Sequence, residues 1–379
     1  MKNKKMLIAF PMLSILLTSC GPVNNWQDHI DDNTYVRTLK YHDNFNILQL
    51  TDIHWNANTS SIASKQYINK LLDQVEAKVG DKKIDLIEIT GDQFMLANTY
   101  HIKTFVEFFE EQAEKRDFMY TVIWGNHDRH GLYNPNWLSK QFKNAKHCIY
   151  VEPEDNLYGR SNFVINLTID GTVDTQAIWQ IANLDSGASF SETAVSPFRD
   201  YDYIREDQVN WWKAEHDKVG ALVPTIAYYH IPQQDNLEAW NKIHDEGAVM
   251  KNKFFKLEGF ADNGNEEYAS KFIEVGRENG LRAAFMGHAH NVDWTVDYNG
   301  VVLGLGVKTG GELYYAHIDP QDQTPELQEG LASLPTAIDE KFDLIGASLV
   351  TIKNALDFDL EHIYFNERVS GDFVRWEKW

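Results

Sequence analysis

Five short polar clusters, each at the end of an apolar run, carry the side chains that could do chemistry in this sequence. They are Asp52-Ile53-His54, Gly91-Asp92, Gly125-Asn126-His127-Asp128, His230 and Gly287-His288-Ala289-His290. Their carboxylate, imidazole and amide groups are ligands that borderline divalent and trivalent metals accept. The set is large enough to hold two metal ions side by side around one shared aspartate, with a His–Asp pair left over. Such a centre is suited to hydrolysis, and a phosphate ester is its natural substrate.

Each cluster follows a segment with the length and composition of a buried strand. These predicted strands are Phe45–Leu50, Asp85–Thr90, Met119–Trp124, Thr225–Tyr229 and Leu281–Met286. Between the first three, apolar residues recur at helical spacing over 62–79 and 102–113. The alternation predicts an α/β fold with parallel strands and right-handed crossovers. Because parallel strands have their carboxyl ends at one edge of a sheet, clusters far apart in the sequence are expected to meet there.

The remainder of the chain continues in short elements without an obvious internal linker or repeat. Further strands are expected at 163–169, 176–182, 292–298, 301–305, 347–352 and 360–365, and a helix at 206–218. Asn299-Gly300 lies between two of these strands and is typical of a type I′ hairpin turn. We therefore expect one large domain over residues 43–379 rather than two smaller ones.

A single Asp-X-His or Gly-Asp is a weak signal, since such residues more often form a turn or a hydrogen-bonded histidine. The five clusters in order, each after a predicted strand, resemble the calcineurin-like metallophosphoesterase superfamily over most of residues 43–318. The contexts Leu48–His54, Trp124–Asp128 and Tyr229–Pro232 are similar to its purple-acid-phosphatase-like branch. The resemblance implies a four-layer α/β/β/α sandwich of two mixed sheets flanked by helices, with the metal site at the carboxyl ends of the strands.

The resemblance also implies a role for each polar residue of the clusters. The first metal ion would be held by Asp52, His54, Asp92 and His290, and the second by Asp92, Asn126, His230 and His288, with Asp92 as the bridge. His127 would stay free of metal and act on the phosphoryl group or the leaving group, and Asp128 would orient it.

The identity of the two metal ions stays open between Mn, Fe and Zn. Purple acid phosphatases carry a tyrosine three positions after the bridging aspartate, and this chain has Met95 there. Without the phenolate ligand, the purple charge-transfer band is expected to be absent.

Several neighbours of the clusters allow two interpretations. The aromatic residues beside the clusters could line a cleft or belong to the core; they are Trp55, Trp124, Tyr229 and Trp294. Arg129 and His130 could meet phosphate oxygens or lie on a solvated loop. The turn Asp185-Ser186-Gly187 resembles one that supports the ligands in this branch.

The N-terminal segment has the features of a bacterial lipoprotein leader. Three lysines precede the apolar run Met6–Leu17, which is shorter than the about twenty residues that a membrane-spanning helix needs. The run ends in Thr18-Ser19-Cys20, which resembles a lipoprotein processing site. We expect residues 1–19 to be the signal peptide, Cys20 to be lipidated, and residues 20–42 to form the lipidated cysteine and polar tether. The mature protein would be exported and lipid-anchored to the outer face of the cell membrane.

The composition indicates a folded domain and bears on its partners. Of the 379 residues 43% are hydrophobic and 13% aromatic, which is sufficient for a large core. The formal net charge of −21 argues against a nucleic-acid partner, because nucleic-acid binding relies on lysine and arginine to neutralise phosphates.

We therefore expect a phosphomonoesterase, similar to an acid phosphatase, that hydrolyses small phosphate esters outside the cytoplasm. The alternatives are a phosphodiesterase or nucleotidase and, in a different class, a non-catalytic surface-binding lipoprotein.

Overall fold

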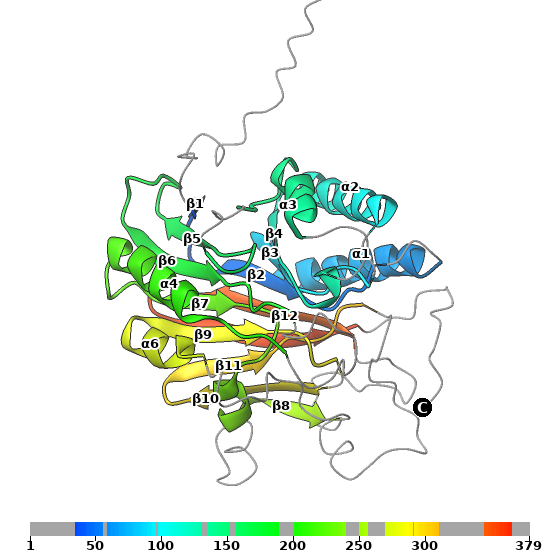
Figure 1. Ribbon diagram of the computed structural model, residues 1–379. Helices are drawn as coiled ribbons and strands as arrows, with labels where there is room; N and C mark the ends of the chain where they lie inside the picture. The colour runs from blue at the N-terminus through cyan, green and yellow to red at the C-terminus, as the bar shows by residue number, and fades with distance from the viewer. Residues whose placement is uncertain are drawn as a thin grey trace, which may run out of the picture.

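Two β-sheets packed face to face between two layers of helices form the fold (Figure 1). The computed structural model describes residues 35–55, 59–95, 98–129, 135–151, 157–188, 201–239, 250–256, 270–290, 292–310 and 345–365. The proposed leader, Cys20 and most of the tether lie outside these described residues, as does His130.

The smaller sheet has five strands, three of which are followed by polar clusters. Its order is β13 (Phe358–Tyr364), β12 (Gly346–Ile352), β2 (Phe45–Leu50), β3 (Leu86–Thr90) and β4 (Met119–Ile123). Strands β2, β3 and β4 are parallel, whereas β12 and β13 are antiparallel additions. Every residue of β2 and β3 is buried, which explains why these segments read as nearly continuous apolar runs.

The larger sheet has eight strands and carries the other two clusters. Its order is β1 (Val36–Lys40), β5 (Phe163–Thr168), β6 (Ala177–Asn183), β7 (Thr225–Tyr228), β9 (Leu281–Met286), β11 (Val301–Leu305), β10 (Val292–Tyr298) and β8 (Met250–Lys256). Strands β6, β7, β9 and β11 are parallel neighbours. Between β10 and β11, Asn299 and Gly300 both have positive φ angles, of 54° and 87°, as a type I′ turn requires.

Helices cover the outer face of each sheet. Helices α1 (Thr59–Val79), α2 (Thr99–Arg116) and α3 (Pro135–Lys143) lie on the side of the five-stranded sheet, and α4 (Glu206–Val219) and α6 (Phe272–Glu278) lie on the side of the eight-stranded one (Figure 1). Asn98 caps α2 by accepting a hydrogen bond from the amide of His101 at 2.9 Å. No helix of the described ranges combines the length and apolar character that crossing a membrane demands.

The four-layer α/β fold with two mixed sheets is thus confirmed, and the strand predictions agree with the structure to within two residues. The division of the chain into leader, tether and domain stays a prediction.

The interior between the sheets is mostly apolar but contains a buried polar row. Ile47 of the smaller sheet and Ile226 and Phe285 of the larger one belong to one hydrophobic cluster. Within this interior lies Glu88 of β3, which is fully buried and stands in register with Gln49 and Thr121 on the neighbouring strands.

Candidate metal centre

Three ligand residues in the loops after β2 and β3 have an unusual backbone conformation. Asp52, His54 and Asp92 have φ angles of 52°, 50° and 51°, in the left-handed region that non-glycine residues rarely adopt. Each such residue costs about 1–3 kcal/mol and persists where surrounding structure holds it. Here the two loops hold each other, because Asp52 donates its amide to the carbonyl of Gly91 at 3.1 Å and His54 to that of Asp92 at 3.0 Å.

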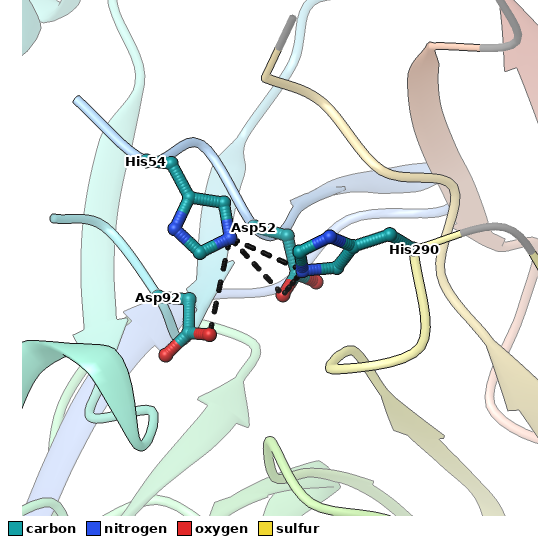
Figure 2. A group of neighbouring side chains, drawn as sticks. All are labelled: Asp52, His54, Asp92 and His290. Carbon is teal, nitrogen blue, oxygen red and sulfur yellow. Dashed lines mark hydrogen bonds and ion pairs between the residues drawn. The ribbon is translucent and has the colours of Figure 1, made fainter. Parts of the chain in front are cut away.

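The first group of ligands consists of Asp52, His54, Asp92 and His290, whose side chains point toward one another (Figure 2). The Nε2 atom of His54 lies 3.1 Å from His290 Nε2 and 3.9 Å from Asp92 Oδ2. His290 Nε2 lies 3.2 Å from Asp52 Oδ1. All four side chains are at most 9% exposed.

The second group shares Asp92 with the first and adds residues from three other strand ends. His230 Nε2 lies 3.3 Å from Asp92 Oδ2 and 3.1 Å from Asn126 Oδ1. His288 belongs to the same cluster as Asp92 and His230. The Nδ1 atom of His230 lies 2.9 Å from the carbonyl of Thr90, and this contact orients the ring. All seven predicted ligands therefore lie close together, and Asp92 belongs to both groups.

The two sheets contribute to both groups of ligands. Four of the ligands follow strands of the five-stranded sheet, namely Asp52, His54, Asp92 and Asn126. The remaining three follow strands of the eight-stranded sheet, namely His230, His288 and His290. The centre thus lies where the carboxyl ends of parallel strands from the two sheets meet.

Two glycines allow this close approach. A Cβ atom on Gly91, which has a φ angle of 95°, would stand 2.2 Å from the Nδ1 atom of His230. A Cβ atom on Gly287 would stand 2.0 Å from the hydroxyl of Thr51. The glycines of the Gly-Asp and Gly-His-X-His clusters therefore make room for the opposing loop.

The chemistry of this donor set fits metal ions. Within the described part of the chain, Asp92 Oδ2 is buried and makes no hydrogen bond of good geometry, and His288 Nε2 is likewise buried without a hydrogen-bond partner. The facing nitrogens of His54 and His290 can share at most one proton between them. A cation would satisfy these atoms, and the mixture of carboxylate, imidazole and amide suits Mn, Fe or Zn.

The electrostatics of the site favour anionic carboxylates. Burial opposes ionisation of Asp92, yet the charges of His230 and His127 hold its pKa well below the usual range. Burial likewise opposes ionisation of Asp52, and the hydrogen bond and charge of His290 hold the pKa of Asp52 well below the usual range. For His230, burial is outweighed by Asp92, which raises the pKa of the imidazole to about 9. Metal binding at His230 must therefore release a proton.

His127 lies beside the ligands but differs from them in exposure. Its side chain is 25% exposed, and its Nε2 atom lies 4.0 Å from Asp92 Oδ2. Its backbone amide donates to Asp92 Oδ1 at 2.8 Å, so the same turn that presents the imidazole also holds the bridging carboxylate. His127 thus borders both the ligands and solvent.

Asp128 makes contacts that the sequence did not indicate. Its two oxygens accept the backbone amides of Phe94 at 2.9 Å and Gly125 at 2.8 Å. Asp128 therefore ties the turn η2 (His127–Arg129) to the loop after β3. Its predicted contact with His127 stays a prediction.

The structure places the aromatic neighbours in the core and pairs Arg129 with a buried carboxylate. The aromatic residues beside the ligands are fully buried in the hydrophobic clusters; they are Trp55, Trp124, Tyr229 and Trp294. Arg129 forms an ion pair with the buried Asp185. Ser186, the next residue, accepts the amide of Ile231 at 2.8 Å beside His230, which agrees with a supporting turn.

Two contacts near the ligands were missed by sequence reasoning. The ring of Tyr201 stands edge-on to His288 with centroids 4.2 Å apart. Lys308 is only 2% exposed and donates from Nζ to the carbonyl of Asp52 at 2.6 Å. The segment after β11 carries no metal-ligand motif, so nothing in its pattern indicated this proximity.

The chain was compared with family models, solved structures and curated proteins, and the family match agrees with the site. Residues 45–292 match the family described as calcineurin-like phosphoesterase. Among solved structures, a dimetal phosphatase from Danio rerio is 10% identical with a TM-score of 0.48, over 86% of this chain and 100% of that one. GAP50, described as the anchor in the inner membrane complex of Plasmodium, is 11% identical with a TM-score of 0.46, over 86% of this chain and 90% of that one. A comparison with curated proteins found no match.

The family match spans all the ligand clusters, and the ligands converge as a two-metal centre requires. The chain therefore belongs to the calcineurin-like phosphoesterase family and is a metal-dependent phosphoric ester hydrolase.

Proposed function

We propose that this hydrolase is a phosphomonoesterase of the purple-acid-phosphatase-like branch that acts on small esters outside the cytoplasm. The observation that carries the proposal is the position of His127. Its imidazole reaches solvent at 25% exposure while its Nε2 atom lies 4.0 Å from the shared Asp92 carboxylate. A side chain in this place can meet both the phosphoryl group and the departing alkoxide of a small ester.

Bound metal ions supply Lewis acidity, which activates water and polarises phosphoryl oxygens. The protein's own groups would complete the reaction. His127, when protonated, stabilises charge on the phosphoryl oxygens or gives a proton to the leaving alkoxide. Asn126 offers a neutral amide oxygen, so the ligand set carries less negative charge against an anionic substrate. Asp128 keeps the turn that presents both residues in place through its two amide contacts.

The choice of a monoester over a polymeric diester is supported by charge. The chain has a formal net charge of −21. Arg129, the arginine of the turn that carries His127, is already paired with Asp185. An acidic chain repels a long polyanion, whereas a small ester needs only the centre itself.

The test compares p-nitrophenyl phosphate with bis-p-nitrophenyl phosphate after loading with Mn²⁺, Fe²⁺ or Zn²⁺. We expect a higher kcat/KM for the monoester, and the most active loading would identify the metal. A preference for the diester would favour the phosphodiesterase alternative. A fully metal-loaded protein that is inert on both esters and on nucleotides would favour the non-catalytic binding protein.

The metal-loaded protein is expected to lack a purple colour. Met95 occupies the position of the tyrosine in purple acid phosphatases, and a thioether cannot provide phenolate-to-iron charge transfer. A visible spectrum of iron-loaded protein tests this, and a strong charge-transfer band would contradict it.

We also propose export and anchoring through a lipid on Cys20. The support is the order of Lys2, Lys4 and Lys5, the apolar run Met6–Leu17, and the small residues before the cysteine. Cys20→Ser is expected to move the protein from the membrane fraction to the soluble fraction and to abolish labelling by a fatty-acid analogue. Unchanged fractionation and labelling would contradict the anchor.

A further inference from the structure

A short segment after β11 runs alongside the loop that supplies two ligands of the first metal. Thr309 donates its amide to the carbonyl of Thr51 at 2.8 Å, and its hydroxyl accepts the amide of Thr51 at 3.1 Å. Gly310 donates to the carbonyl of Asp52 at 3.3 Å. The loop is thus paired on this side with residues 308–310 and on the other side with the loop after β3.

The approach at Gly310 is close enough to require glycine. A Cβ atom at this position would stand 2.0 Å from the carbonyl oxygen of Ile53 and 2.8 Å from that of Asp52. A side chain would therefore push the ligand loop away from the segment. The contact at Gly310 therefore sets the distance between residues 308–310 and the ligand loop.

Lys308 provides the charged contact of this segment. Its side chain is buried, at 2% exposure, and its Nζ atom donates to the Asp52 carbonyl at 2.6 Å. The accepting carbonyl belongs to a residue with a φ angle of 52°. The backbone carbonyl of Lys308 accepts the amide of Gly346 at the start of β12, so the lysine is itself held by the five-stranded sheet.

We propose that Lys308 is a positioning residue of the first metal site. A charge-assisted hydrogen bond is stronger than a neutral one, and this one fixes the peptide group that joins Asp52 to Ile53. That peptide separates the two ligands of the loop, so its orientation determines whether the Asp52 carboxylate and the His54 imidazole face the same ion. Burial keeps Lys308 away from substrate, and its hydrogen bond acts on the loop that carries the ligands. The inference rests on the ligand assignment of the proposed function.

The experiment measures metal binding rather than turnover. Apoprotein is titrated with MnCl₂, and free Mn²⁺ is followed by electron paramagnetic resonance for wild type, Lys308→Met and Lys308→Arg. We expect two sites in the wild type. In Lys308→Met, one site should weaken about 10–100-fold, the usual effect of removing a group that orients a ligand, while the other site keeps its affinity. Lys308→Arg keeps a donor and should recover part of the loss.

Lys353→Met is the matched control, since Lys353 is an exposed lysine directly after β12 that forms an ion pair with Asp359 of β13. It should bind both ions as the wild type does. Gly310→Ala displaces the same loop without changing charge, and we expect the same selective loss of one site. It carries the test if circular dichroism in chelator shows that Lys308→Met is unfolded.

The results that would overturn the positioning role differ from the result that would refute the two-metal centre. Two unchanged affinities in folded Lys308→Met, or an equal weakening of both sites, would overturn the positioning role. Fewer than two Mn²⁺ sites in the wild type would instead refute the two-metal centre on which the proposed function depends.

Discussion

Replacing Glu88 by glutamine is expected to stabilise the protein by an amount that grows with pH. Glu88 is fully buried between the sheets, and neither carboxylate oxygen has a hydrogen-bond partner of good geometry in the described part of the chain. Burial raises the pKa of Glu88 from 4.5 to about 8, and the neighbouring Asn183 amide offsets only part of this effect. Glutamine has nearly the same shape and carries no ionisable group.

The sign and size of the effect follow from proton linkage. Below pH 4.5 the carboxyl group is protonated in both the folded and unfolded chains and adds no pH dependence. Between pH 4.5 and 8 the folded chain keeps a proton that the unfolded chain has lost, so the free energy of unfolding falls as pH rises. At about 1.36 kcal/mol per unit, the penalty reaches about 3 kcal/mol at pH 7 and levels off at about 5 kcal/mol above pH 8. Glu88→Gln removes this penalty.

The assay is urea unfolding of apoprotein in chelator at several pH values between 5 and 9, which keeps metal binding out of the measurement. The difference in unfolding free energy between Glu88→Gln and wild type should widen up to about pH 8 and then stay constant. Glu107→Gln is the control, because Glu107 is an exposed glutamate of α2 paired with Lys103 at 3.7 Å. A difference for Glu88→Gln that does not change with pH would refute a buried, protonated Glu88.

Three further substitutions test the centre itself. His127→Ala should retain both metal ions by elemental analysis and lose about 10²–10⁴-fold in kcat on p-nitrophenyl phosphate, and unchanged turnover would remove His127 from the reaction. Asp92→Ala should lose both ions, because its carboxylate belongs to both ligand groups; retention of one tightly bound ion would contradict the bridge. Gly287→Ala should lower metal affinity without unfolding the protein, since the added Cβ would meet Thr51 and force the two loops apart. Wild-type affinity in Gly287→Ala would show that the loops can adjust.

Residues that follow predicted strands could be located from the sequence, whereas contacts made by segments without a motif could not. The proximity of Asp52 and Asp92 was predictable because both follow buried parallel strands of one sheet, which puts them at one edge. His230 follows a strand of the other sheet, and its place beside them was implied by the family resemblance. The contact of Lys308 with Asp52 joins residues 256 positions apart, and no periodicity indicates which segments become neighbours across two sheets.

The backbone conformation of the ligand loop could not be predicted from the sequence either. Asp52 and His54 adopt left-handed φ angles that their side chains do not favour, so only the hydrogen bonds from neighbouring loops explain them. The core position of Trp55 and Trp294 was similarly undecided, because a buried aromatic and a cleft-lining one have the same sequence signature.

The division of each ligand group between the two sheets has a mechanical consequence. Asp52 and His290 lie 238 positions apart in the chain, and a metal ion bound by both acts as a crosslink between the sheets. Unlike a disulfide, this link is lost when the chain unfolds, so it stabilises the folded chain by the free energy with which the ion binds it. Among the described residues Cys148 is a free, buried cysteine, so the link between the sheets in this part of the chain is the metal centre and not a disulfide. Loading the site would then hold the two sheets together more firmly than in the apoprotein.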